Sequence, residues 1–306
     1  MSIHHRLLAG TYQPLKLVKN IARSLRLSPA DRLRVLLYHD IAPGDLDRFG
    51  AQLRWLAKSW NFVSPDLFAA MISGDEPISG RNLLVTFDDG FASNRIVAEQ
   101  VLRPMGVRAI FFVVSDFAAM EDRGEARRFI ADRVQPGADP DDLPEHWGNM
   151  GWTDLEALLE QGHCIGAHTR THARLSDVTD EHELNREIVS SADTLRRRLG
   201  APVEHFAYPF GDLASFSLEA LMVAGRRFRF VHSGLRGGDE GGVSPFALRR
   251  DASAGQDRSS NYSVFSNSLL GTFLEGGADF RYTASGDQLD SWIRSVNDSS
   301  QADHIE

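Results

Sequence analysis

Short apolar runs alternate along the chain with longer segments in which apolar residues recur every three or four positions. The runs are too short for helices and contain many β-branched and aromatic residues, which favours buried strands. They lie at 33–38, 83–87, 107–114, 163–167 and 227–232. The longer segments predict amphipathic helices at 46–60, 91–102, 153–160, 180–199 and 218–225. Such an alternation predicts an α/β fold with a parallel sheet rolled into a barrel, rather than a β-sandwich.

The segment 180–199 shows the helical pattern most clearly. Its apolar positions form one stripe, made of Leu184, Ile188, Ala192, Leu195 and Leu199. Asp180 and Glu183 have the spacing of a capping box at the first turn, and Gly200 followed by Pro202 ends the helix. The start, the buried face and the end of this helix are therefore all predicted by local residues.

Chain length and composition fit one large folded domain with extensions at both ends. At 306 residues, with 42% hydrophobic and 25% charged residues, the chain exceeds the roughly 200–250 residues that single barrels commonly use. We predict the barrel domain at 33–255, an N-terminal extension at 1–32 and a C-terminal extension at 256–306 that is disordered from residue 298 onward. Residues 118–150 are expected to form an excursion over one end of the barrel.

Two polar motifs follow two of the predicted strands. Asp88 and Asp89 come directly after one strand, and His168 and His172 begin and end a segment directly after another. Each motif alone has an ordinary explanation, because Asp favours turns and a single histidine is more often a buried polar residue than a ligand. Together, however, they supply two carboxylates and two histidines four residues apart, which we expect to project from one side of a helical turn. One Asp and two His can hold a divalent cation while the other Asp accepts a proton from water, so the motifs predict a mononuclear metal hydrolase.

The sequence resembles the polysaccharide deacetylases with a NodB-homology domain, also called carbohydrate esterase family four. The resemblance runs from about residue 35 to about residue 251. It passes through Leu-Tyr-His-Asp at 37–40, Thr-Phe-Asp-Asp-Gly at 86–90, Ala-Ile-Phe-Phe-Val at 109–113, Gly-Trp-Thr at 151–153, His-Thr-Arg-Thr-His at 168–172 and Phe-Ala-Tyr-Pro-Phe-Gly at 206–211. The resemblance implies a deformed (β/α) barrel that removes acetyl groups from N-acetylated sugars. By position it implies that Asp88 is the catalytic base and that Asp89, His168 and His172 bind the metal.

The last of these blocks supplies backbone donors. Tyr208, Pro209 and Phe210 precede Gly211, and the proline and glycine favour a tight connection that leaves N–H groups pointing outward. In the family that the chain resembles, the backbone N–H at the position of Phe210 helps to hold the oxyanion. We therefore assign Tyr208, Pro209 and Phe210 to the substrate and oxyanion position.

The chain departs from the family pattern in three places. Many members carry an arginine two positions before the proline, where this chain has Ala207, so an arginine that orients the base must come from elsewhere. Arg249 or Arg250 is the candidate for this arginine, and we select Arg249. The alternative is that the two arginines form a solvated basic pair at a strand end. An Asp-rich motif after the Pro-Phe block has no clear counterpart. The late Leu-x-His motif is matched only by Phe-Val-His at 230–232, so His232 is either the general acid or a partly buried structural histidine.

These features predict a metal-dependent amide hydrolase acting on an acetylated oligo- or polysaccharide. Zinc is the first choice for the cation, and cobalt, manganese or nickel would fit the same nitrogen and oxygen donors. The cation would lower the pKa of its bound water and polarise the acetyl carbonyl, with Asp88 as proton acceptor. Two alternatives stay open: a catalytically silent glycan-binding relative, and a hydrolase of another amide or of an O-acetyl ester.

The N-terminal extension differs in charge from the rest of the chain. The whole sequence has a net charge of −9, whereas residues 1–34 contain seven Lys or Arg and one acid. Apolar residues recur there between basic ones, which predicts an amphipathic helix with Leu15, Val18, Ala22 and Leu25 on one face. Either residues 1–30 contact an anionic membrane surface or another protein of the glycan pathway, or this helix packs across the barrel end.

Other partners and the location are predicted from what the sequence lacks. The chain beyond the N-terminal extension is acidic and has no basic patch interleaved with aromatic residues, so nucleic acid is not an expected partner. The single cysteine, Cys164, can form no internal disulfide, and neither a membrane-spanning stretch nor a signal-peptide pattern is found. The expectation is a cytoplasmic protein, with peripheral attachment to the inner face of the membrane as an option.

Overall fold

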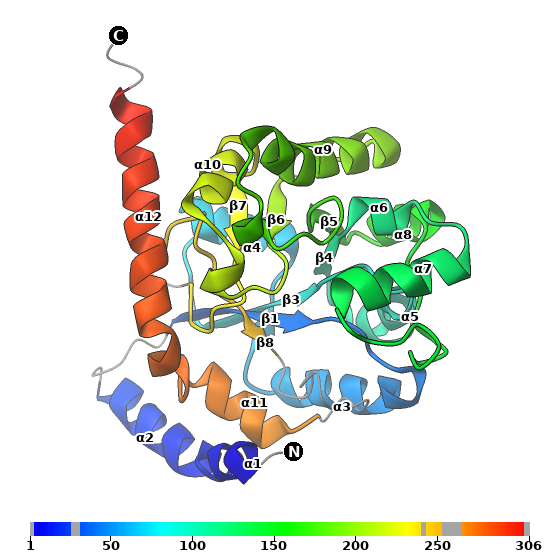
Figure 1. Cartoon of the computed structure of the whole chain (residues 1–306). Coiled ribbons are helices and arrows are strands. Elements are labelled where there is room, and N and C mark those ends of the chain that lie inside the picture. The colour runs from blue at the N-terminus through cyan, green and yellow to red at the C-terminus, as the bar shows by residue number, and fades with distance from the viewer. Residues whose placement is uncertain (1–2, 26–30, 240–242, 253–264, 303–306) are drawn as a thin grey trace.

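The protein is built around a curved parallel sheet surrounded by helices (Figure 1). The computed structural model describes residues 3–25, 31–239, 243–252 and 265–302. The strands are β1 (Arg32–Tyr38), β2 (Asn61–Phe62), β3 (Arg81–Phe87), β4 (Ala109–Val113), β5 (Cys164–Ala167), β6 (His205–Ala207), β7 (Phe230–His232) and β8 (Asp251–Ala252). Their order in the sheet is β7-β6-β5-β4-β3-β1-β8, and β2 pairs with β3.

The described strands pair in parallel throughout, so their carboxyl ends meet at one end of the sheet. The two edges approach each other, because His232 in β7 forms a single parallel bridge with Leu248, shortly before β8. The sheet therefore curls into an incomplete barrel. This confirms the deformed (β/α) barrel predicted from the sequence.

Successive side chains along each strand point to opposite faces of the sheet, so the core has two layers. Leu33, Val35, Leu84, Ile110 and Phe112 belong to a buried cluster between the strands. Their neighbours belong to a larger cluster that packs against the surrounding helices, including Leu36, Val85, Phe87, Phe111 and Val113. Both faces of the strands are buried, which explains why the strands were visible in the sequence as continuous apolar runs.

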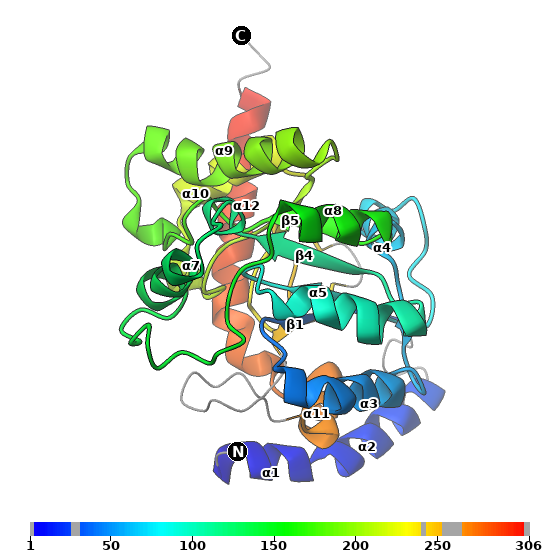
Figure 2. The same cartoon turned by 90° about the vertical axis from the view of Figure 1, so that its right-hand side faces the viewer.

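Helices on the outside of the sheet cover this second layer (Figures 1 and 2). They include α3 (Leu46–Leu56), α4 (Pro65–Ser73), α5 (Ser93–Val97), α8 (Trp152–Glu160), α9 (Glu181–Leu199) and α10 (Leu218–Arg227). The Asp180 side chain accepts a hydrogen bond from the backbone N–H of Glu183 at 2.9 Å, and Gly200 ends α9 in a left-handed conformation. Two predicted helices differ in extent: α3 ends at Leu56, and α5 passes into a π-helical turn at Ala98–Leu102.

The predicted excursion at 118–150 is folded and has a small core of its own. It contains α7 (Arg123–Phe129) and a π-helical turn at Ile130–Val134, and it follows α6 (Ser115–Ala118). Apolar residues of the excursion pack with Phe91, Val114 and Phe117. The Asp40 carboxylate, just beyond β1, accepts hydrogen bonds from His146 Nε2 at 2.8 Å and Trp147 Nε1 at 2.9 Å. These bonds anchor the end of the excursion beside the carboxyl ends of the strands.

The helices of the N-terminal extension and the helix at 267–274 form a layer below the barrel, whereas the last helix runs along the side of the barrel (Figure 1). Where the sequence predicted one N-terminal helix, the structure has α1 (Ile3–Gly10) and α2 (Tyr12–Ser24), and both contact α11 (Asn267–Leu274). Of the four residues predicted to share one face, Leu15 and Ala22 are half-buried, whereas Val18 and Leu25, directly after α2, are exposed. In the described part of the chain, no helix combines the length and the apolar character needed to cross a membrane.

The C-terminal extension is more ordered than its composition predicted. Helix α12 (Thr283–Ala302) continues past residue 298, and the last four residues lie outside the described residues. All strands of the barrel fall between residues 32 and 252. The division into regions 1–32, 33–255 and 256–306 stays a prediction.

Candidate active site

Two adjacent carboxylates follow β3 and have different partners. Asp88 and Asp89 are both almost fully buried. The Asp88 N–H donates to Tyr38 O at 2.9 Å, which continues the pairing of β3 with β1 for one residue. Asp89 has a φ of 73°, a left-handed conformation that is uncommon outside glycine. The chain turns sharply at Asp89, and such outliers are concentrated at functional sites.

The two histidines lie on an irregular loop rather than on a helical turn. His168 follows β5, and its N–H donates to Val113 O at 3.0 Å. Thr169 and His172 are left-handed, with φ of 61° and 59°. The predicted helical turn was therefore wrong, although the two rings do meet, with centroids 5.3 Å apart. A chain reversal with positive φ, and not the helical repeat, brings them together.

Glu187 on α9 holds this loop in place. Its carboxylate accepts hydrogen bonds from the backbone N–H groups of Arg170 at 3.2 Å and Thr171 at 2.9 Å, and from the Thr171 hydroxyl at 2.8 Å. One turn further along α9, the Ser191 hydroxyl donates to Thr169 O at 2.8 Å. Neither Glu187 nor Ser191 was predicted from the sequence as a site residue. The signal that could have found them is their spacing of four, which places two polar side chains along one edge of the apolar stripe of α9.

Hydrogen bonds on the far side of each ring determine which nitrogen faces Asp89. His168 Nδ1 lies 2.7 Å from Ala207 O, and His172 Nδ1 lies 2.8 Å from Arg133 O. A carbonyl oxygen can only accept, so each Nδ1 carries the proton and each Nε2 presents a lone pair. Both Nε2 atoms point at Asp89 Oδ1, at 3.3 Å each. Two lone pairs and a carboxylate oxygen thus converge with no proton between them.

A divalent cation fits this arrangement. Asp89 Oδ1 is buried and forms no hydrogen bond, and three converging acceptors repel one another unless a positive charge lies between them. Tetrahedral bonds of about 2.0–2.2 Å place ligand atoms about 3.3–3.6 Å apart, in agreement with the 3.3 Å separations. Among the described residues, this is the one cluster of His, Cys, Asp or Glu with three converging ligand atoms.

The second carboxylate, Asp88, is held by Arg250. The guanidinium contacts both carboxylate oxygens, with Nη1 2.6 Å from Oδ1 and Nη2 2.9 Å from Oδ2. Arg250 is fully buried, donates through Nε to Ser233 O at 2.8 Å, and lies over the Phe112 ring. A two-point contact of this kind fixes the orientation of a carboxylate. The arginine missing at Ala207 is therefore supplied from the segment leading into β8.

The structure corrects the choice of Arg249. Its guanidinium lies 3.6 Å from Asp290 of α12, in a partly exposed pair, and does not contact Asp88. Neighbouring residues of an extended segment point to opposite sides, so only one of the two arginines can enter the barrel. Arg250 takes the inward position, and Arg249 takes the outward position beside α12.

The structure places His232 in the interior of the barrel. Its Nε2 lies 3.0 Å from His205 Nδ1, and its ring is stacked on Phe68 and tilted against Phe112. The side chain is fully buried, and burial lowers the pKa of His232 well below its usual value. A buried neutral imidazole of this kind corresponds to the structural alternative predicted for His232 and does not favour the general-acid role.

The Tyr-Pro-Phe-Gly block forms a tight loop next to the histidines. Phe210 is left-handed, with a φ of 66°, and its ring lies edge-on to His172 with centroids 4.9 Å apart. The Ser215 hydroxyl donates to Pro209 O at 3.0 Å and fixes the turn. Gly211 packs on Gly234 so closely that a Cβ there would lie 2.8 Å from the Gly234 Cα. The loop is therefore rigid, and its Phe210 end adjoins the candidate metal ligands.

The structure combines an incomplete parallel barrel with a candidate Asp-His-His metal site and a neighbouring Asp at the strand ends. The family model for polysaccharide deacetylases matches residues 75–228, which is half of the chain. The chain belongs to the polysaccharide deacetylase family. The matched range includes Asp88, Asp89, His168, His172 and Phe210, whereas Arg250 lies outside it.

Individual relatives agree with this assignment. The Bacillus subtilis protein YxkH, which bears the name of a polysaccharide deacetylase, is 22% identical over 195 residues. This alignment covers 62% of the present chain and 60% of YxkH, so the chain spans less than two thirds of that relative. IcaB from Ammonifex degensii has a similar fold, with a TM-score of 0.59 and 22% identity over 80% of this chain and 97% of IcaB.

Two further solved structures share the fold. The deacetylase PplD of Streptococcus pyogenes, in complex with acetate, has a TM-score of 0.56 and 19% identity over 73% of this chain and 93% of PplD. The deacetylase domain of BpsB from Bordetella bronchiseptica has a TM-score of 0.58 and 18% identity over 74% of this chain and 97% of that domain. At these identities the likeness concerns the fold.

Proposed function

We propose that the protein is a metal-dependent deacetylase that hydrolyses the acetamide of N-acetylated sugars in a polysaccharide or a glycan precursor. The observation that carries the proposal is the convergence of His168 Nε2, His172 Nε2 and Asp89 Oδ1, with the buried carboxylate of Asp88 next along the chain. Membership of the polysaccharide deacetylase family supports the substrate class. The acetate in the PplD complex is the acid that such a reaction would release.

Each residue of the site has a distinct task in this reaction. When bound, a divalent cation would supply Lewis acidity at the acetyl carbonyl and a nucleophilic water at neutral pH. Asp88 accepts the proton of the attacking water, and Arg250 fixes the direction in which Asp88 accepts it. In this proposal the backbone N–H of Phe210 would stabilise the developing oxyanion. The donor set of two nitrogens and one oxygen favours zinc, with cobalt, manganese or nickel as alternatives.

The test is acetate release from chitooligosaccharides and from a panel of N- and O-acetylated bacterial glycans. The protein is stripped of metal and reloaded with zinc or cobalt, and metal content is measured beside activity. Asp88→Asn should abolish turnover and keep the metal, because Asp88 contacts Arg250 and not the histidines. His168→Ala should lose both. Denaturation curves for each variant show whether the fold is intact.

Three outcomes would contradict parts of this proposal. Equal loss of metal in Asp88→Asn and His168→Ala would refute the division of roles between the two aspartates. Acetate release from O-acetylated substrates alone would change the substrate class to an ester. Stoichiometric metal binding without release from any substrate would instead support a catalytically silent glycan-binding relative.

A further inference from the structure

Helix α2 exposes an apolar stripe to solvent. Leu17, Val18, Ile21 and Leu25 are 62%, 61%, 51% and 62% exposed, and Leu7 on α1 is 68% exposed. Among the described residues, five of the eight exposed large apolar side chains therefore lie between residues 7 and 25. A contiguous apolar patch of this kind marks an interaction surface, whereas scattered single residues do not.

The opposite side of α2 accounts for the packing of the helix, so the stripe is not needed for folding. Tyr12 is buried against Trp55 and Gly271, and Leu15 lies close to Gly277. Helix α2 is therefore compatible with both alternatives predicted from the sequence, contact with another surface and packing across the barrel end. The inner side packs below the barrel, and the outer side has no partner among the described residues.

Basic side chains border the stripe. Lys16 and Lys19 are half-buried at the margin of α2, and residues 1–30 carry five Lys or Arg and no acid. Residues 31–306 have the opposite balance, with 28 Lys or Arg and 42 Asp or Glu. The segment that exposes the apolar stripe therefore has a net positive charge, whereas the rest of the chain has a net negative charge.

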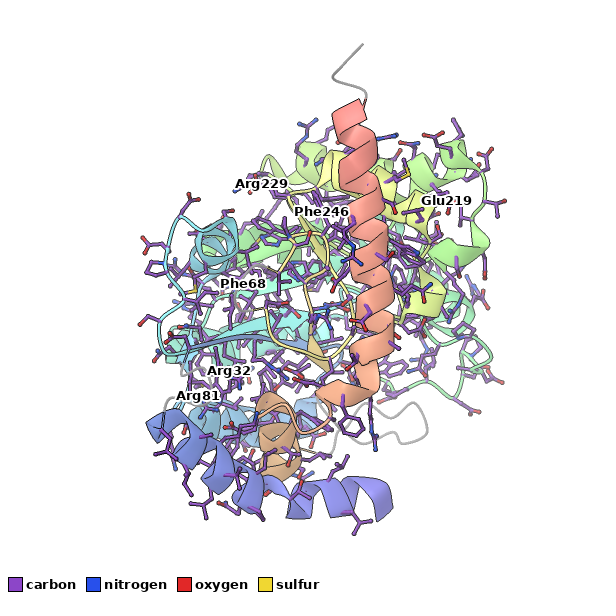
Figure 3. All side chains as sticks on the ribbon, turned by 90° about the vertical axis from the view of Figure 1, so that its left-hand side faces the viewer. Arg32, Phe68, Arg81, Glu219, Arg229 and Phe246 are labelled. Atoms are coloured by element: carbon purple, nitrogen blue, oxygen red, sulfur yellow. The ribbon has the colours of Figure 1, made fainter. Side chains whose placement is uncertain are left out.

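A recess along the inner margin of α2 adds further cations and aromatic rings. Its lining includes Tyr12, Lys16, Trp55, Lys58, Trp60 and Arg81. Arg81 stacks over Trp60 at 4.2 Å and pairs with Glu275 at 2.6 Å, whereas Lys58 is exposed. Figure 3 labels Arg81, the first residue of β3, just above α2. Lysine and tryptophan side chains next to an apolar surface are typical of a bilayer interface.

We propose that α1 and α2 dock the protein on an anionic lipid bilayer, with Leu17, Val18 and Ile21 in the acyl boundary and Lys16 and Lys58 among the headgroups. Charge favours this occupant over a second copy of the chain. A two-fold dimer through the stripe would bring two basic segments together, whereas an anionic surface neutralises them. The absence of a spanning helix among the described residues agrees with a helix lying in the plane of the interface.

Docking through α2 leaves the candidate active site free. Arg81, in the recess, begins β3, and Asp88 follows the end of the same strand. Seven residues of parallel strand span roughly 20 Å, so the recess and the candidate active site lie at opposite ends of β3. Contact of lipid headgroups with the recess would therefore not cover the candidate active site.

The test is co-flotation of the intact chain with phosphatidylcholine vesicles that contain or lack phosphatidylglycerol. We expect the intact chain to float with the anionic vesicles, and Leu17→Gln/Ile21→Gln to lower the bound fraction roughly ten-fold or more. Leu67→Gln/Ile96→Gln is the matched control, because it replaces exposed apolar residues of α4 and α5 and should bind as the intact chain does. Lys16→Gln/Lys58→Gln should reduce binding to the anionic vesicles roughly ten-fold.

Several results would overturn the proposal. One is failure of the intact chain to float, and another is equal flotation of Leu17→Gln/Ile21→Gln. Sedimentation in the absence of lipid tests whether a second copy of the chain covers the stripe instead. A concentration-dependent dimer that Leu17→Gln/Ile21→Gln abolishes would show that a second copy covers the stripe. Because both replaced residues are more than half exposed, their polar variant should unfold at the same denaturant concentration as the intact chain.

Discussion

Replacing Arg250 by methionine should destabilise the protein far more than the same change at its neighbour, Arg249. The Arg250 guanidinium is fully buried and makes two contacts with Asp88, at 2.6 and 2.9 Å, and the Asp88 side chain is 4% exposed. The Arg249 guanidinium lies 3.6 Å from Asp290, and these side chains are 19% and 43% exposed. The two substitutions are chemically identical and one residue apart, so they differ in burial and pairing alone.

The expected magnitudes come from the two environments. Unit charges about 4 Å apart interact with about 4 kcal/mol at an effective dielectric constant of 20. Removing one partner of a buried pair costs about 3–5 kcal/mol, because the remaining charge keeps its desolvation penalty. A partly exposed pair such as Arg249–Asp290 contributes about 0–1 kcal/mol. Arg250→Met should therefore lower the free energy of unfolding by at least about 2 kcal/mol more than Arg249→Met.

Urea denaturation followed by tryptophan fluorescence measures this difference at neutral pH. Activity and metal content are measured on the same samples, and Arg250→Met should lose turnover while it keeps metal. The double variant Arg250→Met/Asp88→Leu should recover much of the lost stability, because it removes both buried charges. Equal losses for the two single methionine variants, or a loss below about 1 kcal/mol for Arg250→Met, would refute the reasoning.

Two further predictions concern His163 and Glu187. Burial, with help from Arg108 and Arg95, lowers the pKa of His163 to about 4. The unfolded chain therefore binds a proton between about pH 6.5 and 4 that the folded protein does not, and stability falls as the pH falls through this range. Urea denaturation at several pH values gives the change in the free energy of unfolding per pH unit. In His163→Asn this change should be smaller by up to about 1.4 kcal/mol per pH unit, and an unchanged pH dependence would contradict this. Glu187→Ala should weaken metal binding about 10–100-fold in a chelator competition, because the loop carrying both histidines loses its anchor. Glu183→Ala, on the exposed side of α9, is the control, and equal weakening in both variants would argue against an anchoring role.

Local patterns were sufficient for five strands of the sheet, β1, β3, β4, β5 and β7, and for the convergence of the main site residues, whereas the short strands β2, β6 and β8 were not predicted. The helix predicted at 180–199 is found at 181–199, because its cap, apolar stripe and terminal glycine are all local signals. The apolar runs became strands because both faces of a parallel sheet are buried. Parallel strands end at one edge of the sheet, so residues that follow β3 and β5 were expected to meet, and Asp89, His168 and His172 do.

Other features of the site depend on contacts between residues far apart in the chain. His168 and His172 meet through left-handed backbone at Thr169 and His172, and Glu187 stabilises that loop from a helix outside the motif. Nothing in the spacing of the two histidines specifies such a loop, because a helical turn satisfies the same spacing. The tautomers of both rings are likewise determined by carbonyl groups of β6 and of the excursion.

The sequence by itself determined the longer strands, most helices around the barrel and which residue types gather at the carboxyl end of the sheet. Only the tertiary structure decided that Arg250 rather than Arg249 contacts Asp88, and that Val18 faces solvent while Leu15 packs inward. The physical reason is the same in both cases. Periodicity limits which positions share a face, but strand register and helix docking decide which face is buried, and these depend on partners distant in the sequence.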